Sequence, residues 1–391
     1  MMIKQEKKKK SIGRMIAGIL VKVLFIVLFS LVPNLMPASW AEFYHRNMYG
    51  YVSFLPASFS NLFHNSLTEL IVVAGGIMLI ILSVVFLVEL IRRIISKTAG
   101  RFVLTVLKHV LTLVLVLIIL FDLMLGIGYR RKTVYQYLGL RHGEYTYDEY
   151  LQVLEWSYNG MVKARRNIGQ DYRGVGHTAR SFEANAKYAN SLINTVSVKY
   201  ELPLSAAFIR SKPVAASHYW SMTGIVGMYD PVFVEANINT DYMDITSFPM
   251  TLCHEICHAK GLARENDCNL MASIACIHSK DSEYMYAGYY FIFTSLYPVV
   301  KEYAGQEGEI FPDYFSYEDM APVIRDMKAS DAYWDDIHST ELSRFIHDIG
   351  RESNNLFLKS NGQEGGVATY HVPDNEYVDF YMTYLKGAKN A

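Results

Sequence analysis

Two histidines four residues apart, with a glutamate directly after the first, are the side chains of this sequence best suited to chemistry. Residues 254–258 read His-Glu-Ile-Cys-His, which matches the pattern HExxH. Residues four apart lie on one face of an α-helix, so His254 and His258 can reach the same Zn²⁺ ion. Glu255 can then face a water held by that ion and act as general base. The pattern predicts a zinc-dependent hydrolytic site; the alternative is an ordinary helix with two chance histidines.

The residues around the motif predict the short helix that this chemistry requires. Thr246 and Ser247 can cap its start, and Pro249 suits its first turn. Gly261 follows His258 by three residues and supplies a stop. We therefore expect the motif to lie on one short helix.

A catalytic zinc site needs a third protein ligand and an open position for water. After Gly261 an apolar run predicts a second helix, on which Glu265 and Asn269 share one face. This arrangement resembles the glutamate-ligand zincins, in which that Glu binds zinc and the Asp or Asn four residues later holds a ligand histidine. The resemblance implies these roles for Glu265 and Asn269. Asp267 is the rival ligand, about 200° around the helix from Glu265, and Glu265 could instead be an exposed acid favoured by the helix dipole.

The first 130 residues of this 391-residue chain hold most of its long apolar runs. Three runs are long enough to span a bilayer, at about 15–37, 70–90 and 106–129. Buried core helices are the alternative for any one of them. We therefore expect a membrane anchor over residues 1–132 and a separate domain over residues 133–391.

Basic residues predict how the chain is oriented in the membrane. Six Lys and Arg precede the first span and four lie around the second-to-third loop, whereas the first-to-second loop has only Arg46. An excess of Lys and Arg marks the cytoplasmic side, so the domain after the third span is expected outside the cytoplasmic membrane. Arg130, Arg131 and Lys132 oppose this orientation, although long domains can translocate despite such charges. The first span could also be a cleaved signal peptide.

The segments before the motif predict helices and then an extended region. Residues 143–199 show helical spacing over two stretches, and Gly224–Asn237 is extended. An edge strand ahead of the motif could pair with an extended substrate by strand addition, through Gly227 and Tyr229. A structural hairpin that covers the core is the alternative. The expected fold is an α-helical anchor of three transmembrane helices plus a mainly helical α+β zincin-like domain.

An aromatic helix is predicted after the motif, over residues 284–297, with Pro298 ending or kinking it. Tyr286 is our candidate to stabilise an oxyanion in the reaction, with Tyr289 as a second candidate. An aromatic stripe is more often part of a core, and this alternative stays open.

The four cysteines all surround the motif. We expect small buried side chains that pack two helices together. A disulfide from one of the first two to one of the last two is an alternative, and thiolate ligation of zinc is another. The positions are Cys253, Cys257, Cys268 and Cys276.

Further stretches carry a resemblance to a known family over nearly the full chain. They are Trp40–Tyr44, Gly126–Tyr129, Gly224–Asn237, residues 254–269 with Cys268 in place of Ala, Tyr286–Tyr289 and Leu358–Gln363. The chain resembles a family of bacterial multi-pass membrane proteins of unknown function that are regarded as zinc metallopeptidases. The resemblance implies a membrane-anchored zincin-like fold and no particular substrate.

These observations predict a membrane-anchored metallopeptidase with Zn²⁺ as cofactor. Its expected partners are the lipid bilayer and a peptide or protein substrate of the cell envelope. One alternative is a proteolytic sensor of envelope stress or antibiotics. Another is a non-catalytic zinc-stabilised scaffold, against which Glu255 argues because a structural site has no use for a general base. A nucleic-acid partner is not expected, since no basic patch with interleaved aromatics occurs.

Overall fold

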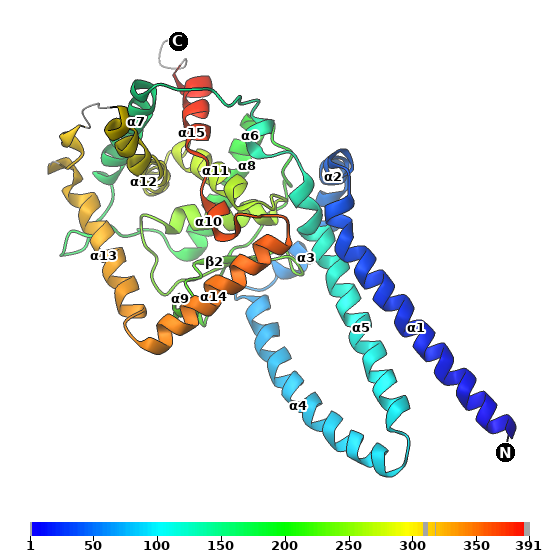
Figure 1. Ribbon diagram of the computed structural model, residues 1–391. Helices are drawn as coiled ribbons and strands as arrows, with labels where there is room; N and C mark the ends of the chain where they lie inside the picture. The colour runs from blue at the N-terminus through cyan, green and yellow to red at the C-terminus, as the bar shows by residue number, and fades with distance from the viewer. Residues whose placement is uncertain (1, 308–311, 317, 387–391) are drawn as a thin grey trace.

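Three long helices form a part of the molecule that projects away from the rest (Figure 1). They are α1 (Met2–Leu35), α4 (Leu67–Ile95) and α5 (Ala99–Met124). Each is long and apolar enough to cross a membrane, and none of the three apolar stretches is buried inside the protein. Because water disfavours so much exposed apolar surface, these helices are suited to a bilayer. The computed structural model describes residues 2–307, 312–316 and 318–386.

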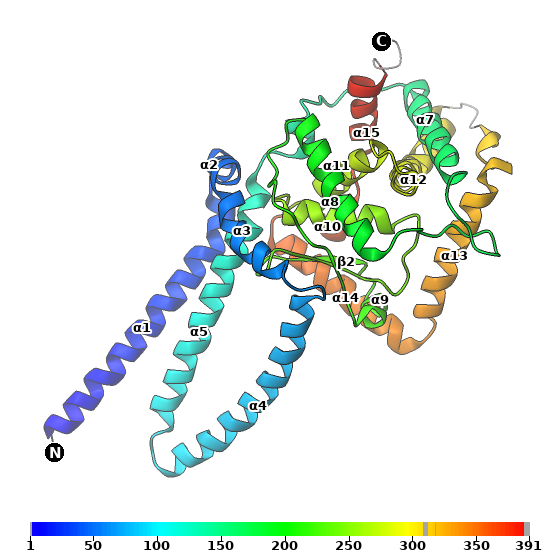
Figure 2. The ribbon, with the colours of Figure 1, turned by 180° about the vertical axis from the view of Figure 1, so that it is seen from behind.

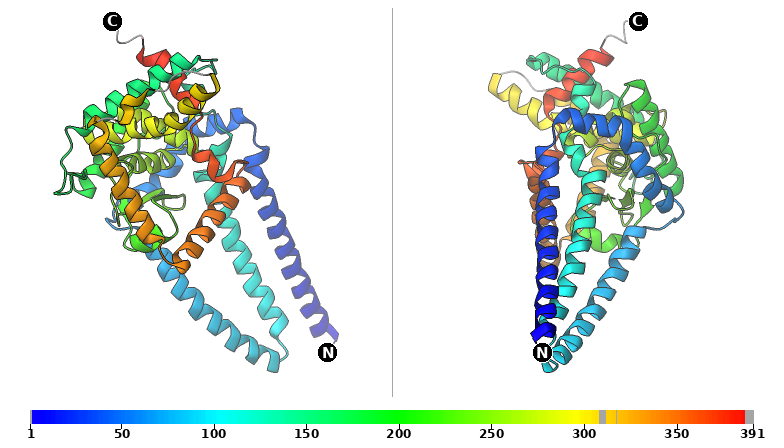
Figure 3. Two further views of the ribbon diagram at one scale, coloured as in Figure 1. Left: turned by 60° about the vertical axis from the view of Figure 1, so that its left-hand side comes forward. Right: turned by 90° about the vertical axis from the view of Figure 1, so that its right-hand side faces the viewer.

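The three predicted spans coincide with these helices, with shifted ends. Helix α1 ends at Leu35, two residues before the predicted end. The third span starts at Ala99 rather than 106 and stops at Met124, because residues Gly126–Arg130 form the 3₁₀ turn η2. The N-terminus and the α4–α5 turn lie at one end of the spans, and the rest of the chain lies at the other (Figures 1 and 3).

The connection between the first two spans packs onto the domain. It contains α2 (Ala38–Tyr44), the π-helical turn η1 (His45–Tyr49) and α3 (Gly50–Ser60). The hydroxyl of Tyr49, which is buried, donates to the carbonyl oxygen of Ala259 at 2.9 Å. This connection is therefore part of the domain's core, although the sequence groups it with the anchor; the domain boundary at residue 132 stays a prediction.

Five helices make up most of the domain's core (Figure 2). Helices α7 and α8 confirm the two helices predicted over residues 143–199, and each begins at a Thr or Ser that caps its first turn. The five are α7 (Tyr147–Arg165), α8 (Phe182–Lys199), α10 (Phe248–Ala259), α11 (Glu265–Ile277) and α12 (Ser282–Glu307).

Helix α12 is longer than predicted, because it continues through Pro298 to Glu307. Pro298 therefore does not end it. The other helical elements among the described residues after the spans are α6 (Val134–Tyr137), α9 (Ser217–Met222), η3 (Asp313–Ser316), η4 (Glu318–Met320), α13 (Ala321–Ile337), α14 (Glu341–Ser360), η5 (Gly366–Tyr370), α15 (Asp374–Phe380) and η6 (Tyr381–Leu385).

A small three-stranded sheet lies against the motif helix. Its strands are β1 (Lys212–Pro213), β2 (Gly227–Asp230) and β3 (Glu235–Ile238), in the order β1-β3-β2. Strand β3 pairs parallel with β1 and antiparallel with β2. The predicted extended segment is thus a hairpin whose first strand, β2, lies at the edge of this sheet. The fold is mainly helical with a small sheet, as predicted, and its likeness to zincins stays a prediction.

A buried ion pair fixes the start of helix α4 to the sheet. Glu235 of β3 and Lys212 of β1 form this pair, and neither side chain is exposed. The Glu235 carboxylate also accepts from the backbone N–H groups of Leu67 and Thr68, at 3.1 and 2.8 Å. Carboxylates are stabilised at a helix N-terminus, so Glu235 holds the first turn of α4 against the domain.

Candidate active site

The polar ends of three buried side chains meet between α10 and α11. The Nε2 atoms of His254 and His258 lie 3.0 Å apart, and Oε2 of Glu265 lies 3.0 Å from the first and 3.3 Å from the second. Ligand atoms about 2.0–2.2 Å from a tetrahedral Zn²⁺ are separated by about 3.3 Å. The three side chains thus fit one such ion.

The chain between the two helices makes this meeting possible. Helix α10 begins at Phe248 with Pro249 in its first turn, as predicted, but Ser247 makes no side-chain capping bond. Gly261 has φ of +106°, which other residues rarely adopt. A Cβ atom there would also lie 3.1 Å from atoms of His45 and Tyr49. Only glycine suits this turn, which brings Glu265 at the start of α11 back over the histidines.

A chain of hydrogen bonds sets the orientation of His254. Its Nδ1 lies 2.7 Å from Oδ1 of Asn269, and Nδ2 of Asn269 donates to the carbonyl oxygen of Tyr370 at 2.7 Å. The second bond fixes which amide atom faces the imidazole. Nδ1 then carries a proton toward Asn269, and Nε2 is the ring nitrogen that faces Glu265 and would bind a metal ion.

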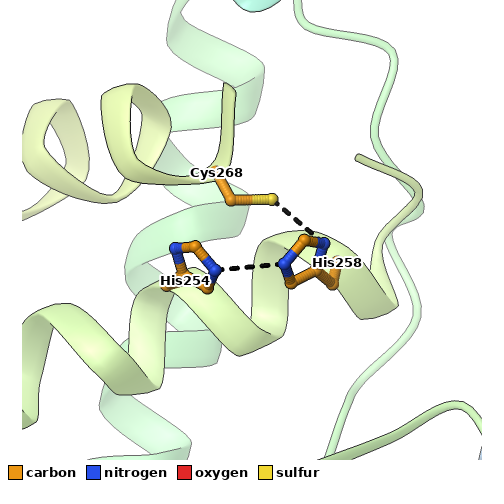
Figure 4. A group of neighbouring side chains, drawn as sticks. All are labelled: His254, His258 and Cys268. Atoms are coloured by element: carbon orange, nitrogen blue, oxygen red, sulfur yellow. Dashed lines mark hydrogen bonds between the residues drawn. The ribbon is translucent and has the colours of Figure 1, made fainter. Parts of the chain in front are cut away.

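His258 is oriented by backbone, and Cys268 lies beside the same ring nitrogen. Nδ1 of His258 lies 3.0 Å from the carbonyl oxygen of Leu262 and 3.3 Å from Sγ of Cys268 (Figure 4). His254, His258 and Cys268 are close enough to be considered as a metal-binding group. However, the sulfur faces Nδ1, whereas Glu265 and His254 face Nε2. The Nε2 side with Glu265 is the better site, because three donor atoms converge there.

Opposite charges dominate the electrostatics of this group. Burial alone would lower the pKa of His258, but the Glu265 carboxylate raises it to about 9. Burial alone would raise the pKa of Glu265, but His258 and the hydrogen bonds from both imidazoles lower it to about 2. Glu265 is thus held as a carboxylate. A zinc ion would replace the proton that lies between Glu265 and the Nε2 atoms of the two histidines.

Glu255 lies buried beside the histidines with an uncommitted oxygen. Its Oε2 makes no hydrogen bond within the described part of the chain. Burial raises the pKa of the carboxyl above its ordinary value. Gly227 of β2 passes directly over it, since a Cβ atom there would lie 2.6 Å from Oε1. The edge strand and the candidate base are therefore immediate neighbours.

Two tyrosines flank the histidines. Tyr229, the second strand residue predicted to bind substrate, is buried and stacks on His258, with ring centres 6.1 Å apart. Tyr370 stacks on His254 at the same distance. Burial and the charge of Glu265 raise the pKa of Tyr370 above its ordinary value, so its hydroxyl stays protonated. Sequence reasoning missed Tyr370, which lies more than 100 residues after the motif and has no local pattern that links it to the histidines.

The rival ligand Asp267 has other partners. Its Oδ1 accepts from the backbone N–H of Val134 at 2.7 Å, and its Oδ2 lies 3.2 Å from Arg264. These contacts lie at the start of α6 and of α11. Asp267 therefore fits a structural role, and the geometry favours Glu265 as the third ligand.

The structure does not bring the predicted tyrosines of α12 to the histidines. Tyr286 is fully buried, and its hydroxyl donates to Oδ2 of Asp326 at 2.8 Å. Asp326 also forms a buried ion pair with Arg165. The ring of Tyr289 packs on Trp156. Both tyrosines thus belong to the core, which was the alternative for this aromatic stripe.

The four cysteines are free and buried. The sulfur atoms of Cys253 and Cys276 lie 3.9 Å apart without a covalent bond. Both belong to the interior between α10 and α11. This agrees with small side chains that pack two helices together.

Comparison with known proteins places the chain in a family without an assigned activity. No curated protein and no solved structure matches it. One family model matches residues 44–374, which is well over half of the chain and contains every side chain of the candidate site. The chain therefore belongs to the family described as "Protein of unknown function (DUF3810)".

Proposed function

We propose that this protein is a membrane-anchored zinc metallopeptidase that hydrolyses peptide bonds of proteins or peptides in the cell envelope. One observation carries the proposal. His254, His258 and Glu265 converge within 3.0–3.3 Å of one another, and the unpartnered carboxylate of Glu255 lies beside them. A purely structural metal site would not require a buried acid with an uncommitted oxygen.

The proposed chemistry divides among four side chains and one strand. A zinc ion on His254, His258 and Glu265 would lower the pKa of a water ligand to about 7 and polarise a peptide carbonyl. Glu255 takes the proton of the attacking water and passes it to the leaving amine. The protonated hydroxyl of Tyr370 is suited to stabilise the oxyanion, and the edge of β2 is suited to hold an extended substrate.

The domain is proposed to lie outside the cytoplasmic membrane. The basic N-terminal segment and the basic turn between α4 and α5 lie at the same end of the spans, away from the domain (Figure 3). The excess of Lys and Arg at that end supports a cytoplasmic position for it. Protease treatment of intact spheroplasts should remove a tag at the C-terminus. Digestion only after lysis would place the domain inside and exclude envelope substrates.

The decisive experiment compares metal content with hydrolysis in the purified full chain. We expect about one zinc per chain, lost in the double variant His254→Ala/His258→Ala. Glu255→Gln should keep the zinc and lose at least about 10²-fold in rate on casein or a peptide library. Glu302→Gln is the matched control, because Glu302 is an exposed acid on α12.

The outcomes separate the competing functions. Zinc-dependent hydrolysis that is unchanged in Glu255→Gln would rule out the proposed base. Tightly bound zinc with no hydrolysis of any substrate would favour a zinc-stabilised scaffold. Hydrolysis that appears only under envelope stress or with an antibiotic would favour a proteolytic sensor.

A further inference from the structure

Helix α14 (Glu341–Ser360) carries an apolar stripe that the protein does not cover. Among the described residues after the last span, twelve large apolar side chains are exposed, and five of these lie on this one helix. The exposed fraction is between 52% and 64% for Leu342, Phe345, Ile349 and Leu356. With 3.6 residues per turn, these four fall within a sector of about 60°. Such a concentration on a single face marks an interaction surface.

The stripe is distinct from the face by which α14 packs on the protein. Ser343 and Leu358 are buried, and Gly350 is so close to Thr223 that a Cβ atom would lie 2.8 Å from the Thr223 carbonyl oxygen. These residues lie about 80–160° around the helix from Leu342. The apolar stripe therefore does not contribute to the packing of α14 on the protein, because another face of the helix makes those contacts.

Charged residues occupy the remaining face of the helix, next to the stripe. Arg344, Asp348, Arg351 and Glu352 are all exposed. Helix α14 thus presents a protein-facing side, an apolar side and a charged side. A helix with a narrow apolar stripe and a strongly charged flank is typical of one that lies in a membrane surface.

Helix α14 adjoins the outer ends of two of the long apolar helices, α5 directly and α4 through α9. Near its C-terminus, Phe357 contacts Phe121 of α5, with ring centres 6.0 Å apart, three residues before this span ends. On its protein-facing side, α14 packs on α9, and the chain just before α9 is fixed to α4. There the Glu69 carboxylate accepts from the N–H groups of Ala215 and Ala216, at 2.8 and 2.7 Å. The helix therefore lies at the depth where α4 and α5 leave the bilayer.

The direction of α14 agrees with this depth. Figure 1 shows the helix, in orange, running across the direction of the spans at the level where they join the domain. A cavity of about 390 Å³ lies beside the contact between its C-terminal end and the spans, lined by Pro33 and Asn34 of α1, Phe121 of α5, and Phe357 and Asn361. The C-terminal end of α14 and the outer ends of α1 and α5 therefore border one cavity.

We propose that α14 lies in the plane of the bilayer surface, with Leu342, Phe345, Ile349 and Leu356 inserted among the lipids of the leaflet next to the domain, where α4 begins and α5 ends. This inference requires only that the three spans cross a bilayer, and it is independent of the zinc site. It gives the domain a fourth contact with the membrane, at a depth of about 5–10 Å.

Spin labels on the full chain in phosphatidylcholine–phosphatidylglycerol nanodiscs test this placement. Nitroxides are attached at Phe345→Cys and Ile349→Cys, with Arg344→Cys and Asp348→Cys as matched controls on the charged flank. The native cysteines are buried, and the unsubstituted chain measures any labelling of them. Collision rates are compared for oxygen, which enters lipid, and a nickel chelate, which stays in water.

We expect the oxygen-to-nickel ratio at 345 and 349 to exceed that of the controls by about threefold or more, at a shallow depth. Equal ratios on the stripe and the flank would overturn the proposal. Exclusion of both reagents from the stripe would show that a second copy or a partner protein covers it, and would overturn it too. A label at the bilayer centre would contradict an in-plane helix. Unchanged melting temperatures in detergent confirm that the labelled chains are folded.

Discussion

Gly227 and Glu255 approach so closely that no side chain fits between them. A Cβ atom on Gly227 would lie 2.6 Å from Oε1, 2.8 Å from Cγ of Glu255 and 2.9 Å from Thr251. Real Cβ atoms do not approach other atoms this closely, so the edge strand can lie over the carboxylate only because this position is glycine. Two parts of the proposed site are therefore in direct contact: Glu255, the proposed base, and β2, the strand proposed to hold the substrate.

Gly227→Ala should therefore damage both parts together. We expect the strand or the Glu255 carboxylate to shift, with a loss of about 1–3 kcal/mol in stability and about tenfold or more in hydrolysis. Gly305→Ala is the control, since a Cβ atom there meets nothing within 4 Å and α12 favours alanine. Melting temperature and rate are measured for both. Wild-type activity in Gly227→Ala would show that the strand does not constrain Glu255.

The third ligand is decided by two single substitutions. Glu265→Ala should lose zinc, because it removes the carboxylate oxygen that lies near both Nε2 atoms. Asp267→Ala should keep zinc and lose about 1–3 kcal/mol in stability, because it leaves the buried N–H of Val134 without its acceptor. Metal analysis and thermal unfolding are the two measurements. Zinc lost in Asp267→Ala but retained in Glu265→Ala would reverse the assignment.

The substitutions Tyr370→Phe and Tyr286→Phe test which of the two tyrosines takes part in the proposed reaction. Tyr370→Phe should keep zinc and lower kcat by about 10- to 100-fold, because it removes the protonated hydroxyl of the ring that stacks on His254. Tyr286→Phe should leave kcat unchanged and lower stability by about 1 kcal/mol, through the lost bond to Asp326. The opposite pattern would restore Tyr286 as the oxyanion stabiliser.

Glu376 makes stability depend on pH. Burial, and then the charges of Asp267 and Asp379, raise the pKa of this carboxyl to about 8. Between its ordinary value and pH 8, the folded state holds a proton that the unfolded state releases, so stability falls as pH rises through this window. The slope from one such group is at most about 1.4 kcal/mol per pH unit.

Glu376→Gln removes this slope, since an amide does not titrate. The variant should gain stability relative to the wild type as pH rises from 5 to 8, measured by thermal unfolding of the full chain in detergent. Glu302→Gln serves again as the exposed control. Wild-type and Glu376→Gln curves that stay parallel over this range would show that the carboxyl titrates normally.

The local part of the site could be predicted from the sequence. Helical spacing places His254 and His258 on one face, and Gly261 permits the turn that returns Glu265 and Asn269 to them. These relationships span only sixteen residues, and backbone geometry largely determines them. The same reasoning found the three spans, because their length and apolar content are also local properties.

The rest of the site depends on packing between distant segments, which no local pattern encodes. Tyr370 reaches His254 only because η5 is fixed to α11, through the bond from Asn269 to its carbonyl. Tyr286 follows the motif on the next helix but one, as a site residue could, yet its hydroxyl donates to Asp326 in the core. The connection that carries Tyr49 belongs to the predicted membrane anchor, but its contact with Ala259 makes it part of the domain's core.

The ion pair of Glu235 and Lys212 determines whether the domain could ever leave the membrane as a folded protein. A protease that cut the chain after α5, at Lys132, would free nothing, because α4 would stay attached to β3 through the carboxylate of Glu235. Pulling the domain away would strip that carboxylate of the N–H groups of Leu67 and Thr68 and expose two fully buried charges, at a cost of several kcal/mol. A single cut in the chain after α5 would therefore leave the folded domain bound to α4 through these contacts.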